Sequence, residues 1–261
     1  MFSTLLVVAL TFAPVQGGPA ASDARQVSLE APQTIAQVDT GKMKGEPWRL
    51  AWSPDGSQLY VETVDRDGSG NVKATHGALI TVVSKSVKNM DQAPPWVGKY
   101  WLWKSGQASP AAPTFKIAVA QRQEVVRSTA APTGGALAKG GIPDPGANST
   151  MGDANSAANS AQQETIFDLK VKSELIGEWI NEAVVPGENF TWAPAPGRMI
   201  AYAKKGGGPL MLLDDQAHKQ ALAGAKDAVL PAWSENGAQL AWLEKKDKKH
   251  YDVTIATIAQ K

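Results

Sequence analysis

The chain contains no cysteine, only three histidines and almost no net charge. Without cysteine, disulfides, thiolate zinc sites, a thiol nucleophile and a lipid-anchored N-terminal cysteine are excluded. The histidines, His76, His218 and His250, are far apart in the sequence, so none belongs to a paired spacing typical of metal ligands. A formal net charge of +1 gives no general field that would attract nucleic acid, so we expect no nucleic-acid partner.

Long hydrophobic runs are also missing, and no segment approaches the roughly 18 to 20 apolar residues that cross a bilayer. A shorter run, Leu5 to Ala13, is followed by Pro14 and small residues, with Gly18 and Ala20 at the spacing of a signal-peptidase site. This order predicts a signal peptide over residues 1–20 and a mature domain over 21–261, periplasmic or secreted and without a transmembrane segment. The alternative is an apolar first strand, because no Lys or Arg precedes the run.

What the chain does contain is one pattern in three copies: a tryptophan, a tight turn and an alternating apolar segment. The copies are Trp52 to Val61, Trp192 to Tyr202 and Trp233 to Trp242. Proline presets the φ angle of a turn's second position and glycine accepts a positive φ, and one or both follow each tryptophan. Alternating apolar residues indicate a strand with one buried face. Each copy therefore predicts two strands joined by a turn, and the 41 positions from Trp192 to Trp233 match one four-stranded propeller blade.

The segments Leu50 to Gly56, Phe190 to Tyr202 and Pro231 to Leu243 resemble the WD40-like repeats of TolB-type β-propellers. In those repeats the sequence Trp-Ser-Pro-Asp-Gly joins two strands of each blade. The first copy has this sequence, whereas the third has Glu235-Asn236 where Pro-Asp would stand. The resemblance covers about half of the chain. It implies an all-β propeller that binds a protein partner in the cell envelope.

The remaining strand signals suggest how such a ring would close. Thr34 to Val38 alternates but has no blade before it, and Tyr251 to Ile258 alternates but has no tryptophan after it. Pairing these N- and C-terminal strands in one blade would remove exposed sheet edges. Residues 128–164 are rich in small and polar residues and lack aromatic ones, so we expect a flexible insertion there. The remaining length predicts about five blades, with four or six as alternatives.

Two segments between the first and second copies fit more than one structure. Ile166, Leu169, Ile176 and Ile180 lie at helical spacing, but the β-rich composition around them favours strands. An aromatic cluster follows a Pro-Pro pair, where the blade pattern is degenerate. Its aromatic side chains could form a sugar platform, a partner hot spot or buried blade core. The cluster comprises Trp96, Tyr100, Trp101 and Trp103, of which Trp101 and Trp103 are the candidate binding residues.

Acidic residues precede each repeat tryptophan. Glu46, Glu188 and Asp227 are therefore the candidates for a loop rim that faces a central channel, although ordinary solvated loop charges fit the same pattern. The chain has no G-x-S-x-G elbow, no phosphate-binding loop and no dinucleotide fingerprint. These observations favour a binding module that is not an enzyme. The alternative is an exported propeller that binds or acts on carbohydrate through its central channel.

One loop partly matches a calcium-binding pattern. Asp65, Asp67 and Ser69 supply oxygen side chains at the first, third and fifth positions, and Gly70 stands at the sharp turn. Position twelve is His76 where a bidentate glutamate belongs, and the preceding segment is typical of a strand. A polar hairpin turn explains the same residues. We therefore expect no cofactor, with calcium at this loop as the alternative.

Overall fold

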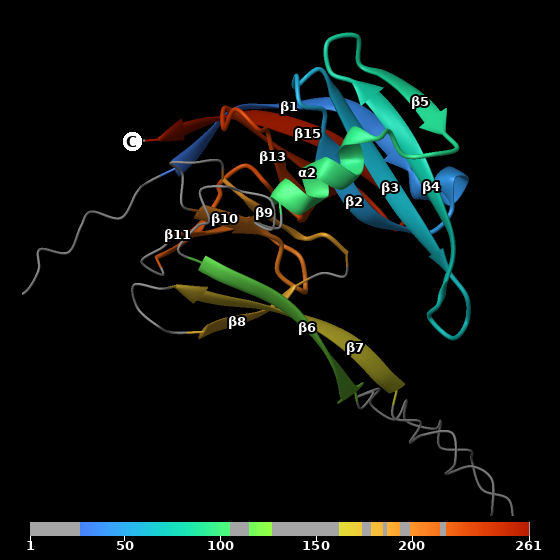
Figure 1. The fold of residues 1–261 in the computed structure, drawn as a ribbon, viewed down its shortest axis with the longest axis vertical. Coiled ribbons are helices and arrows are strands. Elements are labelled where there is room, and N and C mark those ends of the chain that lie inside the picture. The colour runs from blue at the N-terminus through green and yellow to red at the C-terminus, as the bar shows by residue number, and fades with distance from the viewer. Residues whose placement is uncertain are drawn as a thin grey trace, which may run out of the picture.

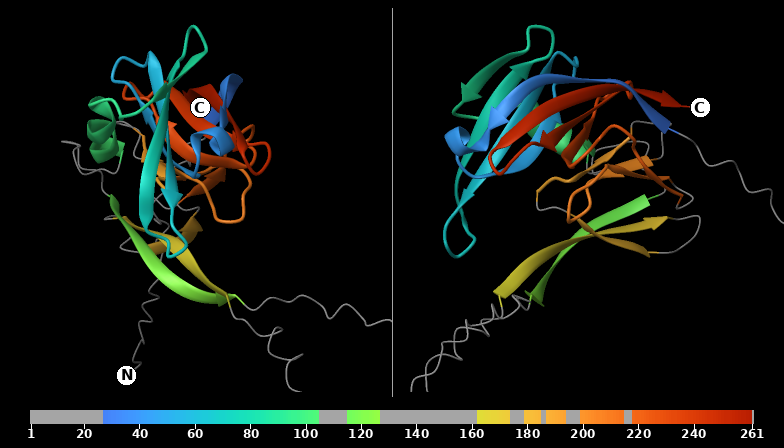
Figure 2. Two further views of the ribbon diagram at one scale, coloured as in Figure 1. Left: turned by 90° about the vertical axis from the view of Figure 1, so that its right-hand side faces the viewer. Right: turned by 180° about the vertical axis from the view of Figure 1, so that it is seen from behind.

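The structure is a computed structural model that describes residues 27–104, 115–126, 162–173, 179–184, 187–193, 199–214 and 218–260. It is mostly β, with four antiparallel sheets and two short helices in the described part of the chain (Figures 1 and 2). The expected signal peptide lies outside these residues. Most of the expected insertion at 128–164 does too, and its last three residues, Gln162 to Glu164, begin a strand. None of the described helices is long and apolar enough to span a bilayer.

Within each sheet the strands pair in chain order, except that the first strand of the described chain joins the last sheet, and each sheet takes the name of the first strand given for it. The β2 sheet contains β2 (Glu46–Trp52), β3 (Gln58–Arg66), β4 (Val72–Thr81) and β5 (Ser86–Met90). The β6 sheet contains β6 (Phe115–Val126), β7 (Gln162–Ser173) and β8 (Trp179–Val184). The β9 sheet contains β9 (Phe190–Trp192), β10 (Met199–Tyr202), β11 (Met211–Asp214) and β12 (Lys219–Ala221). The β13 sheet contains β13 (Ala228–Trp233), β14 (Gln239–Lys245), β15 (His250–Gln260) and β1 (Val27–Asp39).

The first and last strands of the described chain lie side by side. β1 runs antiparallel to β15 from the Val27–Gln260 pair to the Asp39–His250 pair, as the argument from exposed edges predicts. Ile35 of β1 and Val253 of β15 are both buried in the same hydrophobic cluster, so core packing supports the pairing in addition to the backbone hydrogen bonds. After β1 the chain enters α1 (Thr40–Met43), whose Gly41 and Lys42 amides donate to the Asp39 carboxylate.

The three repeat tryptophans occupy equivalent positions, as the pattern predicts. Trp52, Trp192 and Trp233 are the last residues of β2, β9 and β13, and each is buried. Each also stands opposite the second apolar strand of its own copy, facing Leu59, Ile200 and Leu240 respectively. The Trp52 indole Nε1–H donates to the Ala232 carbonyl oxygen at 2.9 Å, so this side chain joins the β2 and β13 sheets.

The turns after Trp52 and Trp233 have the same hydrogen bonds despite their different sequences. In the first, the Ser53 hydroxyl bonds to Asp55 and accepts the Gln58 amide. In the second, the Ser234 hydroxyl bonds to Asn236 and accepts the Gln239 amide. The glycine of each turn has a positive φ, 70° at position 56 and 74° at position 237. An Asn oxygen can thus replace the Asp oxygen, which explains how the third copy departs from Trp-Ser-Pro-Asp-Gly without losing the turn.

Three strands from different sheets, β2, β9 and β13, meet at the centre of the fold. β13 contacts both β2 and β9, and α2 (Trp96–Lys104) packs against β2 and β9 (Figure 1). The aromatic cluster is therefore helical and does not form a degenerate blade. Val97 and Tyr100 are three positions apart and are both buried, which gives the helix its inward face. Of the residues with the ambiguous pattern, Ile166 and Leu169 lie in β7 and Ile180 lies in β8, so the prediction of strands is confirmed there, whereas Ile176 lies outside the described residues.

Candidate functional site

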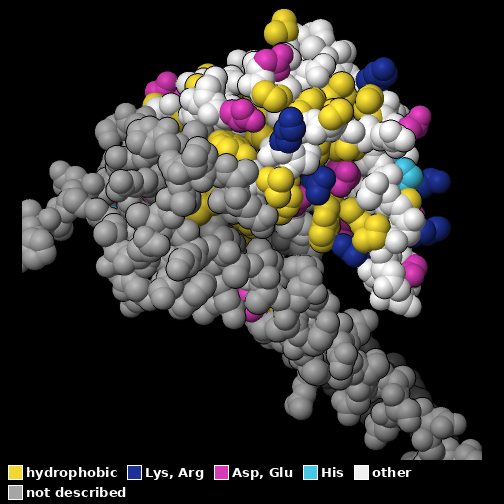
Figure 3. All heavy atoms as spheres, viewed as in Figure 1, with side chains coloured by type: hydrophobic (Ala, Val, Ile, Leu, Met, Phe, Trp, Pro, Cys, Tyr) yellow, Lys and Arg dark blue, Asp and Glu magenta, His cyan; other side chains and the backbone are white. Residues whose placement is uncertain are grey.

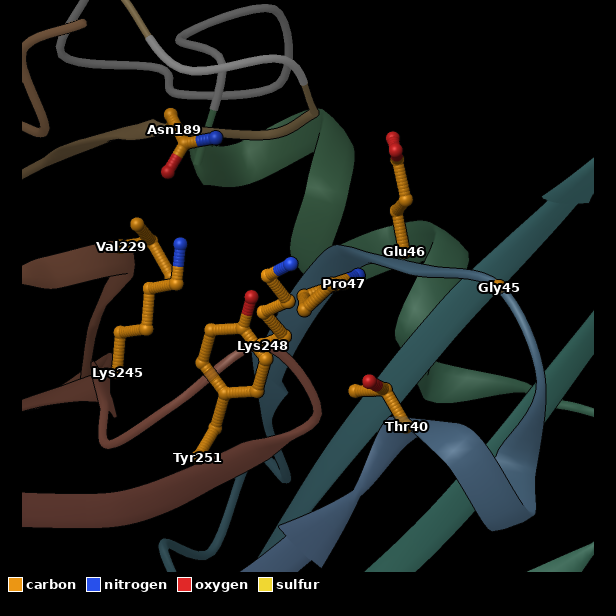
Figure 4. A pocket seen from close by; sticks show the side chains of 9 residues that line it. All are labelled: Thr40, Gly45, Glu46, Pro47, Asn189, Val229, Lys245, Lys248 and Tyr251. Carbon is orange, nitrogen blue, oxygen red and sulfur yellow. The ribbon is translucent and has the colours of Figure 1, made fainter. Parts of the chain in front are cut away.

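The three predicted acidic residues lie at the starts of the three central strands. Glu46 is the first residue of β2, Glu188 lies two positions before β9, and Asp227 directly precedes β13. A cavity of about 450 Å³ is lined by residues from all three starts (Figure 4). Its lining consists of Thr40, Gly45, Glu46, Pro47, Asn189, Val229, Lys245, Lys248 and Tyr251. The structure therefore places Glu46 in the cavity, whereas Glu188 and Asp227 are not among its lining residues.

Asp227 braces the edge of this cavity. Its carboxylate accepts the Gly208 amide at 3.2 Å, and its carbonyl accepts the Lys245 amide at 3.1 Å. Its φ of 42° lies in the left-handed region that non-glycine residues seldom adopt. Asp227 thus fixes the backbone where β13 begins and where β14 ends.

The loops around the cavity are tied to one another. The Thr40 amide and hydroxyl both donate to the Lys249 carbonyl oxygen, at 2.8 and 3.1 Å. The Asp247 carboxylate accepts the amides of Lys249 and His250, and these bonds, with His250, lower the pKa of Asp247 to about 2. These hydrogen bonds brace the loop from β14 to β15 beside α1.

Glu188 lies beneath the loops in a buried ionic cluster. Its Oε1 accepts the Arg49 Nε–H at 2.7 Å, and its Oε2 is buried without a hydrogen-bond partner among the described residues. Arg49 also lies 3.9 Å from a Glu62 carboxylate oxygen. The Lys104 ammonium, from the end of α2, is fully buried and donates to the Glu188 carbonyl oxygen at 3.0 Å. The cluster therefore fastens α2 to the starts of β2 and β9.

Burial shifts the pKa values of Glu188 and Lys104 toward neutral pH. Desolvation raises the pKa of Glu188 to about 7, although Lys104 and Arg49 partly oppose this shift. Desolvation likewise lowers the pKa of Lys104 to about 8, against the attraction of Glu188. Perturbed acids often mark functional sites, but Glu188 is only 5% exposed, so its role here is to hold the interior together.

The Glu188 shift predicts how stability depends on pH. Its folded pKa, about 7, lies above its ordinary value of 4.5, so the folded state holds a proton that the unfolded state releases between these values. This contribution is complete below pH 4.5 and is lost as pH rises through 7. Urea melts at pH 5 and pH 7.5 should show a smaller loss of stability for Glu188→Gln than for the unchanged protein. Glu30→Gln, at an exposed position, is the control, and an equal slope in all three proteins would contradict the assignment.

The two candidate tryptophans lie on α2 and contact different partners. The Trp101 ring is 5.9 Å from the Phe190 ring of β9, and the Lys104 ammonium is 5.6 Å from the Trp101 centroid. The Trp103 ring is 5.4 Å from the Tyr100 ring. Both tryptophans are partly buried against the core clusters. Each therefore contributes to packing α2 onto the central strands.

The candidate calcium loop joins β3 to β4. Asp65 lies near the end of β3, and the Asp67 carboxylate accepts the amides of Ser69 and Asn71, each at 2.9 Å. These bonds lower the pKa of Asp67, as a turn-forming carboxylate should. No group of three or more His, Asp or Glu side chains in the described residues is placed to hold a metal ion.

Sequence reasoning missed the residues that give the site its charge. In the sequence, Arg49 has the pattern of an ordinary strand residue and Lys104 that of a surface residue, and nothing in their local pattern indicates burial. A signal existed for Lys245 and Lys248, because four lysines fall between positions 245 and 249 directly after a strand. Acidic and basic side chains are interspersed elsewhere, for example on the face shown in Figure 3.

No protein-family model and no curated protein matches the chain. Among solved structures it is similar to Sqt1 from Chaetomium thermophilum, with 12% identity, 85% of this chain and 44% of that chain covered, and a TM-score of 0.20. It is also similar to oligogalacturonate lyase from Vibrio parahaemolyticus, with 8% identity, coverages of 86% and 68%, and a TM-score of 0.23. The chain thus spans less than half the length of Sqt1.

Proposed function

We propose that this chain is an exported, noncatalytic β-propeller that binds a protein partner in the cell envelope through the loops at the cavity. The observation that carries the proposal is the meeting of the starts of β2, β9 and β13 around one cavity of about 450 Å³. Loops on a rigid scaffold are where binding residues concentrate. Loops that are already ordered before binding also lose less conformational entropy on association.

The propeller itself is part of this proposal. The sheets would be blades, the central strands would be β2, β9 and β13, and the pairing of β1 with β15 would close a ring of about five blades, with four or six as alternatives. The repeated tryptophan turns, which resemble those of TolB-type propellers, support this architecture. Export to the periplasm or beyond rests on the signal-peptide pattern of residues 1–20.

A binding role suits the chemistry of the cavity better than catalysis does. Its polar groups, which include Glu46, Lys245 and the Tyr251 hydroxyl, alternate with the apolar walls of Pro47 and Val229. Such a mixture of apolar surface and a few fixed polar groups recognises a ligand by shape and hydrogen bonding. The most perturbed acid, Glu188, is bonded to Arg49 in the interior and is not presented to a substrate.

Site-specific photocrosslinking tests the proposal. A photoreactive phenylalanine analogue would replace Glu46 in the cavity or, as the control, Val83 in the exposed turn between β4 and β5. After irradiation in an envelope extract of the source cells, we expect one discrete protein adduct at position 46 and none at position 83. Equal labelling at both positions would reject this end as the binding surface. Enrichment of glycan without a protein adduct would overturn the proposal in favour of a carbohydrate-binding propeller.

A further inference from the structure

We propose that the cavity receives an acidic side chain of an extended segment of the partner, with its carboxylate held between Lys245 and Lys248 beside the Tyr251 hydroxyl. This inference rests on the proposed function and names the chemistry of the partner. It follows from the charges that line the cavity, the hydrogen bonds that brace the loops and the lining residues that disfavour polyanions and sugars.

Lys245 and Lys248 line the cavity without an ion pair to any described residue, whereas two other lysines near it are paired. Lys246 is paired with Glu244 at 3.4 Å and with Asp252 at 3.2 Å. Lys42 of α1 is paired with Asp39 at 3.6 Å. None of the ion pairs found in the described residues involves Lys245 or Lys248, and both residues are exposed. The cavity therefore carries two positive charges that no described carboxylate neutralises by direct pairing.

Three hydrogen-bond donors, from Lys245, Lys248 and Tyr251, line this cavity together. Figure 4 shows the side chains of Lys245, Lys248 and Tyr251 pointing to the same side of the cavity. Ammonium and phenol groups all donate hydrogen bonds, and a carboxylate only accepts them. Hydrogen bonds between charged donors and carboxylates are about twice as strong as neutral ones. The bonds of Thr40 and Asp247 that fix the surrounding loops leave little ordering for the ligand to impose.

Other features of the cavity favour a peptide over a polyanion or a sugar. Glu46 places a carboxylate in the same cavity, which would repel a run of phosphates more strongly than one carboxylate and could accept an N–H of an extended backbone. Binding of bases relies on exposed aromatic faces for stacking, and a sugar platform needs such a face as well. Tyr251 is the aromatic residue that lines the cavity, and it is only 8% exposed. Pro47 and Val229 provide apolar contact for the neighbouring side chain of a peptide.

Fluorescence anisotropy with defined probes tests this inference. The probe is a labelled eight-residue peptide that alternates glutamate with leucine, so that its carboxylates share one face when it is extended. A matched peptide replaces every glutamate with glutamine. We expect the acidic peptide to bind at least about tenfold more tightly, because charged hydrogen bonds are lost in the neutral peptide. The Lys245→Ser/Lys248→Ser variant should lose that preference, whereas the control Lys88→Ser/Lys99→Ser, which removes two exposed lysines elsewhere, should retain it.

Each remaining result overturns the inference. Equal affinity for the two peptides would remove the role of the carboxylate. Tighter binding of oligothymidylate, lost in the Lys245→Ser/Lys248→Ser variant, would identify a nucleic-acid site, and tighter binding of a uronic acid trisaccharide would identify a glycan site. Thermal melts establish that both lysine variants are folded. If the acidic peptide shows no preference but a protein still crosslinks at position 46, only the acidic ligand is rejected. If no protein crosslinks at position 46, the proposed function is rejected as well.

Discussion

Replacing Trp52 with alanine should lower the free energy of unfolding by about 3–5 kcal/mol. The side chain is fully buried at the end of β2, among the core residues Leu50, Leu59 and Ile80. Its removal deletes a large apolar volume that the neighbouring strands cannot refill. It also removes the indole donor that bonds the Ala232 carbonyl of β13 at 2.9 Å, so a buried acceptor loses its partner.

Urea denaturation followed by far-ultraviolet circular dichroism measures this loss. Trp52→Phe separates the two contributions, because the ring volume is largely kept while the indole N–H is lost, and it should cost about 1–3 kcal/mol. The control is Val83→Ala at an 89% exposed position, which should stay within about 0.5 kcal/mol of the unchanged protein. A Trp52→Ala midpoint equal to that of the control would mean that the tryptophan does not join the sheets, and the alignment of the three copies would fail with it.

The repeat could be predicted from sequence because its determinants are local. Ser53 and Gly56 shape the first turn within five residues, and Ser234 and Gly237 repeat that geometry in the third. Alternation then assigns each following segment to a strand. The pairing of β1 with β15 spans nearly the whole described chain, yet it too was predictable, because two alternating strands without a blade of their own each needed a neighbour.

The position of α2 could not be predicted, because distant bonds determine it. The Tyr100 hydroxyl donates to the Trp233 carbonyl at 2.6 Å, across 133 positions, and Lys104 reaches the Glu188 carbonyl across 84. Nothing within positions 96–104 indicates either partner. The same holds for the cavity, whose lining runs from Thr40 to Tyr251. The position of Glu46 before a repeat tryptophan made it a candidate, but no local pattern indicates that Lys245 and Lys248 line the same cavity.

The second large effect is expected at Arg49. Arg49→Met should lower the free energy of unfolding by about 3–5 kcal/mol at pH 8, the range observed when one member of a buried ion pair is removed. The Arg49 Nε–H donates to Glu188 Oε1 at 2.7 Å, and without it a carboxylate that is only 5% exposed would remain charged in the interior. Arg66→Met is the matched control. Arg66 lies 4.6 Å above the Trp48 ring at the end of β3, and its loss should cost about 1 kcal/mol or less.

The same measurement at pH 5.5 should show a smaller cost. The pKa of Glu188 is about 7 with Arg49 present, and removing a neighbouring positive charge raises it further. Below that pKa the folded Arg49→Met protein binds a proton at Glu188, which neutralises the buried carboxylate. The unfolded chain, with a pKa near 4.5, does not. Lowering the pH therefore recovers stability in the variant, the opposite of the acid destabilisation expected when a folded state depresses a carboxyl pKa.

A double-variant cycle assigns the effect to the Arg49–Glu188 pair. In a Glu188→Gln background no charge remains on residue 188, so Arg49→Met should cost less than it does alone by at least about 1 kcal/mol at pH 8. The pH dependence of that cost should also disappear. If Arg49→Met costs the same at both pH values and in both backgrounds, the Arg49 side chain contributes through packing, and the charge on Glu188 is balanced by Lys104. Lys104→Met would then become the more destabilising substitution at pH 8, because it would remove the remaining positive charge of α2 from the cluster.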